Sequence, residues 1–458
     1  MEKNILLTGA TGIMGFETLK QLIKNESFYI TLLARSKKKN RKKLKKFLHH
    51  DRVRIVWGDL CNYDDVSNAM QGADIVLHLG GMVTPEADRY PELTMKINVT
   101  AAENIVKAAK AQPNADRIKV VYIGSVAQLG PKNAPEHFGC SGDIMNPLPV
   151  DKYAVSKIIA EKTFAESGLN YWVSLRQSAI LYSDLIKKGF NPIIFHVPLL
   201  GVLEWSTIED SGRLLVKLCE TELPDTFWKN FYNISSGNSY RMTNYEFETR
   251  LLEAIYCPPP EKIFEPNWFA IKNFHGCWYS DADLLEDYLH FRDNIPVEDY
   301  FLHILRKQTP WYFRLAKIVP SGIIKWILKR IAYHKTEGTL HWIQSGNEEK
   351  IATYFGSVEE WKKIPSWENF ENNHPSEECK KRKRQDDLPS TSQWKLTDMQ
   401  LFASSLNGKC LSETMTEGDL DTPLLWQNAN GDTFRASPRY VVLGGYFPEK
   451  KIDEYKNI

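Results

Sequence analysis

Residues 4–15 of this chain read NILLTGATGIMG, a short apolar run that leads into a turn of small residues. Glycines at these spacings let the backbone turn tightly between a strand and a helix, and they let a ligand approach the backbone closely. Unpaired N–H groups and the helix dipole at the start of the helix favour a negative charge there. The stretch therefore predicts a strand–turn–helix unit that binds a dinucleotide pyrophosphate. The residues expected to contact it are Gly9, Thr11, Gly12, Ile13, Met14 and Gly15.

Length and composition restrict what the rest of the chain can be. At 458 residues it is too long for one compact core, which predicts two or three domains. The net charge of +1 argues against recruitment of nucleic acid by a global field. The seven cysteines include no Cys-x-x-Cys pair, which favours reduced thiols over a disulfide framework. Because the chain shows no signal-peptide pattern and no apolar run near the ~20 residues of a membrane-spanning helix, we expect a cytoplasmic protein.

Short apolar runs alternate with amphipathic stretches over the first 180 residues. Runs rich in Val, Ile, Leu and aromatics are typical of buried parallel strands, and the stretches between them have helical spacing. Repeated β-α-β units predict an α/β fold with a doubly wound parallel sheet of the Rossmann type, whose ligand crevice lies at the carboxyl ends of the strands. The expected strands are 4–8, 29–34, 53–57, 74–79, 118–124 and 171–176, with helices at 16–25, 92–111 and 152–167.

The later chain changes composition several times. Past residue 180 the alternation weakens and aromatics and prolines become frequent, which favours a substrate-facing lobe. A Trp- and charge-rich stretch with helical spacing follows, and then a polar segment that we interpret as an exposed linker. We expect a domain at 1–280, made of a cofactor-binding core at 1–180 and a substrate lobe from 181, then a helical extension at 281–370, a linker at 371–393 and a small C-terminal domain at 394–458.

The residue at the end of the second strand discriminates between the two nicotinamide dinucleotides. Arg35 stands 20 residues after Gly15, where an NAD-binding fold usually places an acidic residue on the ribose 2′-hydroxyl. An Arg accommodates a 2′-phosphate instead, so Arg35 and the nearby Lys38 favour NADP(H) over NAD. The alternative is that Arg35 is a solvated charge at the strand end. Eight of the ten residues 37–46 are basic, which we interpret as a solvated helix beside the adenosine phosphate rather than a nucleic-acid patch.

Two further turns are expected to contact the cofactor. The third strand ends at Asp59 and Leu60, where a carboxylate can accept a hydrogen bond from the adenine amino group. The fourth strand ends at Leu79, Gly80 and Gly81, where the paired glycines let the backbone lie flat against the cofactor. Each of these segments, taken alone, fits an ordinary turn equally well.

Tyr153 and Lys157 lie four residues apart, so a helix places them next to one another on one face. A free Tyr titrates at about 10, which is too high for ready proton exchange near neutrality. A neighbouring ammonium and an oxidised nicotinamide ring both favour the phenolate and lower that pKa. Tyr153 is thus the expected general acid/base, which donates a proton to a carbonyl oxygen as hydride reaches the carbon, or accepts one in the reverse reaction.

Spacing alone does not identify this pair, because Tyr446 and Lys450 are also four residues apart. Pro448 lies between those two and argues against a regular helix. The strand at 120–124 delivers Ser125 at its carboxyl end, shortly before the first pair, and the Ser125 hydroxyl can orient the reacting oxygen. A plain strand-end cap is the alternative for Ser125 by itself.

Residues 1 to about 255 resemble the extended short-chain dehydrogenase/reductase family, which is NAD-dependent epimerase/dehydratase-like. The resemblance implies that Tyr153 is the general acid/base, that Lys157 binds the nicotinamide ribose and lowers the Tyr pKa, and that Ser125 orients the substrate. It also implies a catalytic neighbourhood for Asn98. The residues that carry the resemblance are Thr8–Gly15, Asp59, Leu79–Gly81, Asn98, Ser125, Tyr153, Lys157, Arg176, Ile208–Asp210 and Tyr232–Ile234.

Departures from that family narrow the expected chemistry. Val126 and Ala127 stand where its 4,6-dehydratases carry an acidic pair, so that elimination lacks its acid and base. The family's sugar epimerases usually bind NAD and hold its ribose with an acidic residue, where this chain has Arg35. The sequence LYSD at 181–184 replaces the family's usual Tyr-Gly-Pro segment, which argues against a nucleotide-sugar pocket. An apolar carbonyl substrate fits the expected pocket residues better, although these residues could also be core. They are Met82, Phe190, Phe195, Leu199, Leu200 and Trp205.

Two C-terminal features lie outside the resemblance. Residues 323–331 (IIKWILKRI) have the pattern of a basic amphipathic helix, which we interpret as packing on the protein, with a membrane surface or a gate for a lipophilic substrate as the alternatives. The tail from residue 409 faintly resembles zinc ribbons, but Cys and His are missing where those carry their later ligands. Because zinc needs about four N or S ligands and Cys410 supplies one, we expect no metal site.

These features predict an NADP(H)-dependent oxidoreductase that interconverts a carbonyl and a secondary alcohol on a small apolar molecule. An epimerase or isomerase that uses the same bound cofactor is the first alternative. The second is a non-catalytic, NADP-sensing scaffold, against which Ser125, Tyr153 and Lys157 argue because binding alone needs no proton donor. The sequence does not decide the oligomeric state and is compatible with a homodimer.

Overall fold

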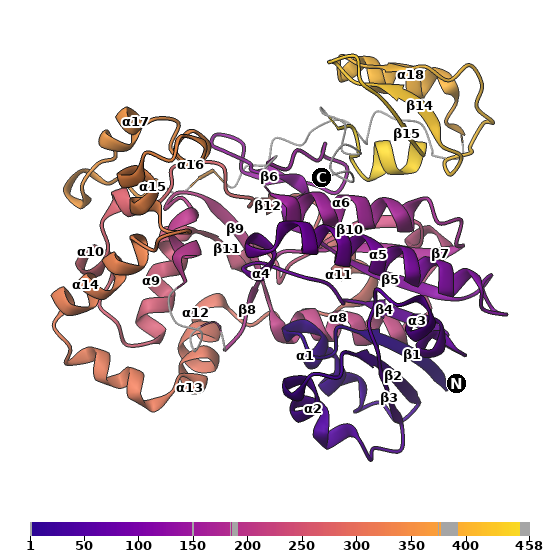
Figure 1. Ribbon diagram of the computed structural model, residues 1–458, viewed down its shortest axis with the longest axis horizontal. Helices are drawn as coiled ribbons and strands as arrows, with labels where there is room; N and C mark the ends of the chain where they lie inside the picture. The colour runs from indigo at the N-terminus through magenta and orange to yellow at the C-terminus, as the bar shows by residue number, and fades with distance from the viewer. Residues whose placement is uncertain are drawn as a thin grey trace.

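A seven-stranded parallel sheet forms the centre of the computed structural model (Figure 1). The structure describes residues 2–148, 151–183, 185, 191–373, 375–376 and 393–448. The strands are β1 (Lys3–Thr8), β2 (Phe28–Ala34), β3 (Val53–Trp57), β4 (Ile75–His78), β5 (Lys119–Ser125), β7 (Tyr171–Gln177) and β10 (Asn230–Ile234). Their order is β10-β7-β5-β4-β1-β2-β3, and every neighbouring pair runs parallel.

Helices cover both faces of this sheet. One face carries α3 (Tyr63–Met70), α5 (Pro91–Lys110) and α6 (Lys152–Ala165), and the other carries α1 (Ile13–Leu22), α2 (Lys38–Leu44), α8 (Ile208–Glu220) and α11 (Asp283–Leu289). Strand side chains alternate between the two faces, so Leu6 packs under the first group while Ile5 and Leu7 pack under the second. The doubly wound α/β fold expected from the sequence is confirmed, and all six expected strands are present.

The strand order reverses between β1 and β4, which lie side by side while β2 flanks β1 on its other edge. Loops that leave the carboxyl ends at such a switch point diverge and leave a crevice for a ligand. The segments that follow Thr8, Ala34, Trp57, His78 and Ser125 all leave the sheet at this edge. The expected cofactor and catalytic residues lie in or next to these segments.

A second lobe is built on smaller sheets. It contains β6 (Phe138–Gly139), β8 (Ala179–Leu181), β9 (Val202–Thr207), β11 (Arg241–Thr243), β12 (Trp278–Tyr279), α9 (Asn244–Ala254) and α10 (Pro260–Ile263). β9 pairs antiparallel with β11 and parallel with β8, and β6 pairs parallel with β12. Aromatic side chains fill the core of this lobe, as in the stack of Trp205 on Phe247 with ring centroids 4.2 Å apart.

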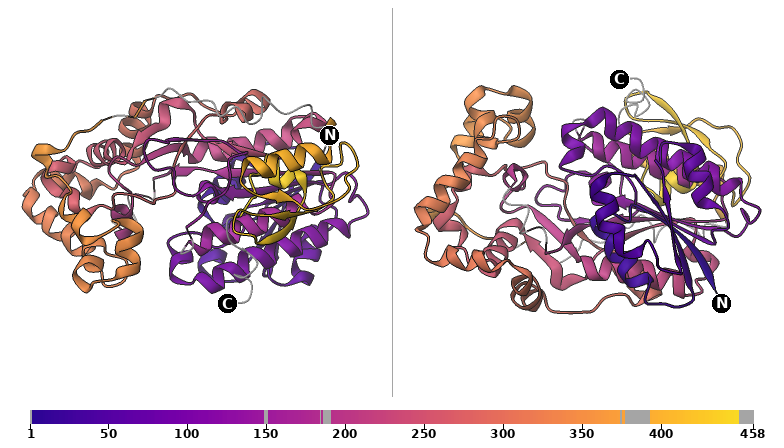
Figure 2. Two further views of the ribbon diagram at one scale, coloured as in Figure 1. Left: turned by 90° about the horizontal axis from the view of Figure 1, so that it is seen from above. Right: turned by 60° about the horizontal axis from the view of Figure 1, so that its bottom comes forward.

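Short helices extend the second lobe away from the C-terminal unit (Figure 2). They are α12 (Val297–Asp299), η7 (Tyr300–Leu305), α13 (Arg306–Gln308), η8 (Trp311–Lys317), α14 (Ser321–Ala332), α15 (Thr339–Ser345), α16 (Glu348–Tyr354), α17 (Val358–Lys362) and η9 (Trp367–Asn369). Their buried side chains, Leu328 and Leu340 among them, join the core of the second lobe. In contrast, α11 at the start of the expected extension packs Leu285 and Leu289 against the central sheet.

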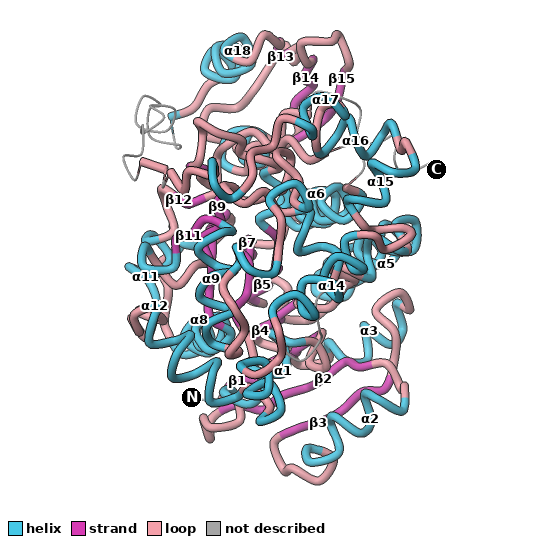
Figure 3. Tube along the Cα trace, turned by 90° about the vertical axis from the view of Figure 1, so that its left-hand side faces the viewer, coloured by secondary structure: helices cyan, strands magenta, loops and turns pink. Residues whose placement is uncertain are grey.

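The C-terminal unit consists of α18 (Leu396–Ser405), β13 (Lys409–Cys410), β14 (Leu424–Gln427), β15 (Thr433–Ala436) and η11 (Arg439–Leu443). It lies beyond α6 (Figures 1 and 3). Trp426 and Tyr440 belong to the same hydrophobic cluster as the inner side of α6. The Tyr440 hydroxyl donates to the carbonyl oxygen of Ile158 in α6 at 2.8 Å. The unit is therefore joined to the main core by packing, and its expected lack of a metal stays a prediction.

Candidate active site

The expected dinucleotide turn has a backbone that requires glycine at two places. Gly9 has a φ of +72°, and a Cβ there would lie 2.8 Å from the backbone nitrogen of Gly80. A Cβ on Gly15 would lie 2.3 Å from the carbonyl oxygen of Gly9. The N-cap of α1 is Gly12, so no side-chain oxygen of that residue takes up the first N–H groups of the helix. The turn therefore fits a phosphate group.

A cation of the basic stretch 37–46 lies across this turn. Lys43 of α2 donates from Nζ to the carbonyl oxygens of Thr11 at 3.0 Å and Gly12 at 3.2 Å. The same ammonium lies 4.3 Å from the ring centroid of Phe16. These contacts add positive charge at the start of α1, where a pyrophosphate would bind. The composition of 37–46 could not identify Lys43, because the rotation of the helix decides which basic residue faces the turn.

Arg35 and Lys38 are exposed where β2 leads into α2. Asn40 donates from Nδ2 to the Arg35 carbonyl oxygen at 2.9 Å and so holds this turn closed. The guanidinium of Arg41 lies over the Trp57 ring, 4.7 Å from its centroid. The Arg35 and Lys38 side chains are thus exposed at the turn after β2, and their contact with a 2′-phosphate stays a prediction.

The turn after β3 lies directly against the turn after β4. Asp59 accepts the Cys61 N–H at 2.9 Å, and its own N–H donates to Asp65 at 2.8 Å. Leu60 packs against Gly80 so closely that a Cβ added to Gly80 would lie 2.4 Å from the Leu60 Cδ1 atom. The structure therefore brings the expected adenine-side residues to the same edge as the glycine turn.

A buried hydroxyl–imidazole pair holds the end of β4 against the end of β1. Thr8 Oγ1 lies 2.9 Å from His78 Nδ1 and accepts the Gly80 N–H at 3.0 Å. Burial, and then the charge of Lys157, lower the pKa of His78 to about 3. The imidazole is therefore neutral near pH 7, and it shares one hydrogen bond with the Thr8 hydroxyl. This network positions the segment Leu79–Gly81 at the crevice.

Ser125, Tyr153 and Lys157 meet at the carboxyl end of β5. The Ser125 hydroxyl hydrogen-bonds the Tyr153 phenol. Lys157 donates from Nζ to the carbonyl oxygen of Ile123 at 2.8 Å and lies 5.0 Å from the ring centroid of Tyr122. The structure therefore assembles the three residues expected to carry the chemistry.

Burial sets the protonation of these groups. It raises the pKa of Tyr153 to about 12, and the hydrogen bond with Ser125 lowers that pKa in part. It also lowers the pKa of Lys157 to about 8, against the opposing charge of Glu161. Desolvation is the largest effect on the Tyr153 pKa, and the Lys157 ammonium is held by the Ile123 carbonyl. The lowering of the Tyr153 pKa by Lys157 stays a prediction. In this state Tyr153 is a proton donor near neutrality.

Asn98 of α5 joins the loop after β4 to α6. Its Oδ1 accepts the Met82 N–H at 2.7 Å, and its Nδ2 donates to the Met82 carbonyl at 3.1 Å and to Ser156 Oγ at 2.9 Å. These contacts are those of a residue that positions the two segments around the crevice. A catalytic role for Asn98 stays a prediction.

Polar groups from distant parts of the chain surround Tyr153. Asp151 caps α6 by accepting the Ala154 N–H at 2.9 Å, and its other oxygen lies 3.2 Å from His275 Nδ1. Desolvation, and then the charge of Asp151, raise the pKa of Asp88 to about 6. An N-cap Asp just before the Tyr153 helix was recognisable from sequence, whereas His275 lies too far along the chain to be linked to it.

The apolar residues expected to line the pocket lie mostly in the core. Phe195, Leu199 and Trp205 are buried in the hydrophobic cluster of the second lobe. Leu200 is exposed, while Met82 is bound to Asn98 as described above. Phe190 lies outside the described residues. Phe195, Leu199 and Trp205 are therefore core residues. They no longer support the expectation of an apolar substrate.

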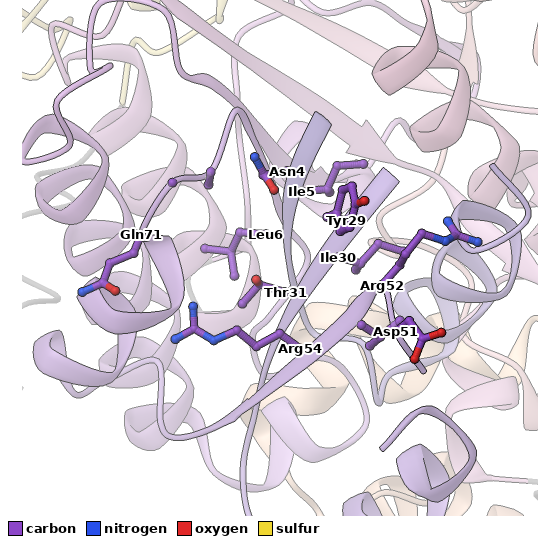
Figure 4. Close-up of a pocket in the computed structure, with 13 residues that line it drawn as sticks. Asn4, Ile5, Leu6, Tyr29, Ile30, Thr31, Asp51, Arg52, Arg54 and Gln71 are labelled. Atoms are coloured by element: carbon purple, nitrogen blue, oxygen red, sulfur yellow. The ribbon is translucent and has the colours of Figure 1, made fainter. Parts of the chain in front are cut away.

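Two other places are separate from this crevice. Tyr446, the alternative tyrosine, stacks on Tyr440 with ring centroids 4.8 Å apart in the C-terminal unit, and Lys450 lies outside the described residues. A pocket of about 310 Å³ lies at the amino ends of the strands, between Asn4, Tyr29 and Arg54 (Figure 4). Because ligands of doubly wound sheets bind at the carboxyl ends, this pocket is not the cofactor site.

The fold is of the doubly wound α/β class, and its glycine turn fits a phosphate group. Residues 5–178 match the sequence model of the NAD dependent epimerase/dehydratase family. The expected resemblance is thereby confirmed for these residues, whereas that of the tail to zinc ribbons stays a hypothesis.

Curated relatives cover part of the chain. A UDP-glucose 4-epimerase of Rickettsia bellii (strain RML369-C) is 29% identical over 196 residues, which are 41% of this chain and 55% of that protein. One from Rickettsia typhi (strain ATCC VR-144 / Wilmington) is 29% identical over 157 residues, 33% of this chain and 44% of that protein. The chain thus spans about half the length of the curated relatives that it matches.

Solved structures share the fold over a longer stretch. A UDP-glucuronic acid 4-epimerase from Bacillus cereus in complex with NAD has a TM-score of 0.52 at 17% identity, covering 67% of this chain and 99% of that one. A double mutant of the dTDP-glucose 4,6-dehydratase DesIV from Streptomyces venezuelae, with NAD bound, has a TM-score of 0.53 at 18% identity, covering 67% and 96%. At these identities the likeness establishes the fold.

Proposed function

We propose that this chain is an NAD(P)-dependent enzyme that acts on CH–OH groups and interconverts a secondary alcohol and a carbonyl. The observation that carries the proposal is the Ser125–Tyr153 hydrogen bond at the carboxyl end of β5, with Lys157 one turn further along α6. A cofactor-sensing scaffold needs no proton donor at this place, so the arrangement argues against that alternative.

Tyr153 moves the proton in this proposal. When bound, the nicotinamide supplies or accepts the hydride at the reacting carbon. In the reductive direction the Tyr153 phenol donates its proton to the carbonyl oxygen, and C=O becomes CH–OH; oxidation returns that proton to Tyr153. A phenol with a pKa of about 12 starts protonated near neutrality, as an acid must. The hydrogen bond with Ser125 favours the phenolate that the transfer leaves. In this proposal Lys157 binds the nicotinamide ribose.

NADP(H) is the proposed cofactor. The Gly9–Gly15 turn and the Lys43 ammonium fit its pyrophosphate. Asp59 is the residue proposed for the adenine amino group. Arg35 and Lys38 support a 2′-phosphate, because β2 ends without the acidic residue that would hold a free 2′-hydroxyl. The two solved relatives described above contain NAD, so this selection is open to direct measurement.

An epimerase is the second candidate. Curated relatives are named as UDP-glucose 4-epimerases, and such a reaction uses the same acid/base chemistry twice on one bound cofactor. The groups around Tyr153 also favour this reading, because Asp88, Asp151 and His275 suit a hydroxylated substrate better than an apolar one. A dehydratase is not proposed, since Val126 and Ala127 follow Ser125.

The two candidates differ in what happens to the cofactor. Purified protein is incubated with NADPH or NADH and a panel of carbonyl compounds while the absorbance of the reduced cofactor is followed. Net consumption that Tyr153→Phe abolishes supports the oxidoreductase. Inversion at C4 of UDP-glucose, seen by NMR without net change in the cofactor, supports the epimerase instead. Tight cofactor binding with neither reaction would favour the scaffold.

A further inference from the structure

α13 and α14 lie at the outer end of the second lobe (Figure 1). Large apolar side chains are exposed along the chain segment around them. Trp311 is 74% exposed, Ile318 77% and Trp326 58%. Large contiguous apolar surface on a protein marks a place of interaction. We call residues 306–333 the basic apolar segment. Its exposed apolar members are Trp311, Tyr312, Leu315, Ile318, Ile323, Trp326, Ile327 and Tyr333.

α14 has two apolar sides. Leu328 and Ala332 are buried in the core of the second lobe, as the packing interpretation of this helix expects. Ile323, Trp326 and Ile327 are not part of that core and are 51%, 58% and 48% exposed. Docking on the protein therefore accounts for one side of the helix and leaves the other side for a partner.

The charged side chains within this stretch of the sequence are all basic. Residues 300–336 contain eight Lys or Arg and no Asp or Glu. Two of the eight are paired with acidic residues elsewhere, because Arg306 binds Glu253 and Lys325 binds Glu265. Within the part of the chain that the structure describes, the other six make no ion pair. These are Lys307, Arg314, Lys317, Lys329, Arg330 and Lys335.

We propose that the basic apolar segment binds peripherally to the surface of an anionic phospholipid bilayer. Trp and Tyr side chains prefer the level of the headgroups, and Lys and Arg attract anionic headgroups. The exposed Ile and Leu side chains then enter the outer edge of the acyl layer, as in other interfacial amphipathic helices. The Arg330 guanidinium lies 4.9 Å from the centroid of the Trp326 ring. Such a pair of an aromatic and a cationic side chain suits the headgroup region and the edge of the acyl layer beneath it.

Other occupants fit the segment less well. α14 is 12 residues long, and among the described residues no helix is long and apolar enough to cross a membrane. The helix therefore lies on the bilayer in this proposal. A second copy docked through the same surface about a two-fold axis would face cations with cations, which disfavours a dimer here.

The test is flotation of the full chain with vesicles of phosphatidylcholine, with or without phosphatidylserine. We expect binding to the phosphatidylserine vesicles that weakens as salt rises from about 0.1 M to 1 M. The double variant Trp311→Ser/Trp326→Ser should lower the partition coefficient at least about tenfold, and Lys329→Glu/Arg330→Glu should do the same. If the first variant melts below the parent, Ile318→Ser replaces it, because that side chain is 77% exposed.

Two matched controls locate the surface. Leu401→Ser changes an apolar side chain of α18 that is 70% exposed, and Lys45→Glu/Lys46→Glu reverses two exposed charges of the other basic stretch; both should bind like the parent. The proposal is refuted if the parent binds equally well to vesicles with and without phosphatidylserine. It is also refuted if the Lys45→Glu/Lys46→Glu variant loses binding while the variants of the basic apolar segment keep it. Light scattering without vesicles measures the oligomeric state. If the parent is a dimer that Trp311→Ser/Trp326→Ser dissociates, the segment is a dimer interface and the proposal of membrane binding is refuted.

Discussion

Arg176 and Glu161 form a fully buried ion pair that joins β7, α6 and the C-terminal unit. Arg176 Nη2 lies 2.6 Å from Glu161 Oε1, and its Nε donates to Oε2 at 3.0 Å. The same Nη2 donates to the carbonyl oxygen of Gly444 at 2.7 Å. Glu161 also raises the pKa of Lys157, one turn earlier in α6. One carboxylate therefore supports both the docked C-terminal unit and the charge of the lysine in the candidate active site.

Glu161→Gln should lower the free energy of unfolding by about 3–5 kcal/mol, because it leaves the Arg176 guanidinium buried without a counter-charge. Urea titration measures this loss. The control is Glu222→Gln, which removes an exposed partner of Lys3 and should cost about 1 kcal/mol or less. Equal stabilities of the Glu161→Gln variant and the parent would contradict the proposed role of the pair.

Tyr153→Phe should reduce turnover by about 10² or more, the usual scale for the loss of a positioned general acid. Folding and NADPH affinity should largely survive, since only a hydroxyl is removed. Tyr446→Phe is the matched control and should be near neutral, because that ring packs on Tyr440 in the C-terminal unit. Steady-state kinetics and cofactor titration on both variants check this. An active Tyr153→Phe enzyme beside an inactive Tyr446→Phe enzyme would move the active site elsewhere.

Arg35→Ala should weaken NADPH binding by about 1.5–3 kcal/mol, the range of a charge-assisted hydrogen bond, and should weaken NADH binding much less. Titration of each cofactor against tryptophan fluorescence measures both affinities. Arg117→Ala provides a control for loss of an exposed Arg, whose side chain is 78% exposed beside Asp116. Equal weakening of both cofactors, or tighter binding of NADH by the parent, would refute NADP(H) selection.

Glu248 of α9 makes stability depend on pH. Burial raises its pKa to about 8, and within the described residues its Oε2 has no hydrogen-bond partner. Between the unfolded value of about 4.5 and pH 8 the folded chain binds more protons than the unfolded chain, so stability falls as pH rises through this window. Glu248→Gln removes this dependence and should raise Tm relative to the parent more at pH 8 than at pH 5. Thermal melts at the two pH values check it; an equal difference at both would contradict a buried, protonated carboxyl.

Local spacing was sufficient for much of the fold and for part of the site. The six expected strands are present because buried parallel strands have a strong apolar signal, and Tyr153 and Lys157 are neighbours because helix contacts are local. Ser125 followed from a rule of topology, since parallel strands end at one edge. By contrast, the apolar residues Phe195 and Trp205 were assigned to a pocket and lie in the core, because hydrophobicity alone does not distinguish the two.

The sequence by itself determined the glycine turn, the order of strands and helices, and the positions of Ser125, Tyr153 and Lys157, because each depends on residues close in the chain or on a general property of parallel sheets. The tertiary structure alone decided which basic residue faces the turn, which groups surround Tyr153, and which side of α14 is exposed. It also joined Arg176 to Glu161 and Gly444. Such contacts depend on how distant segments pack and rotate against one another, and no spacing within one segment encodes that.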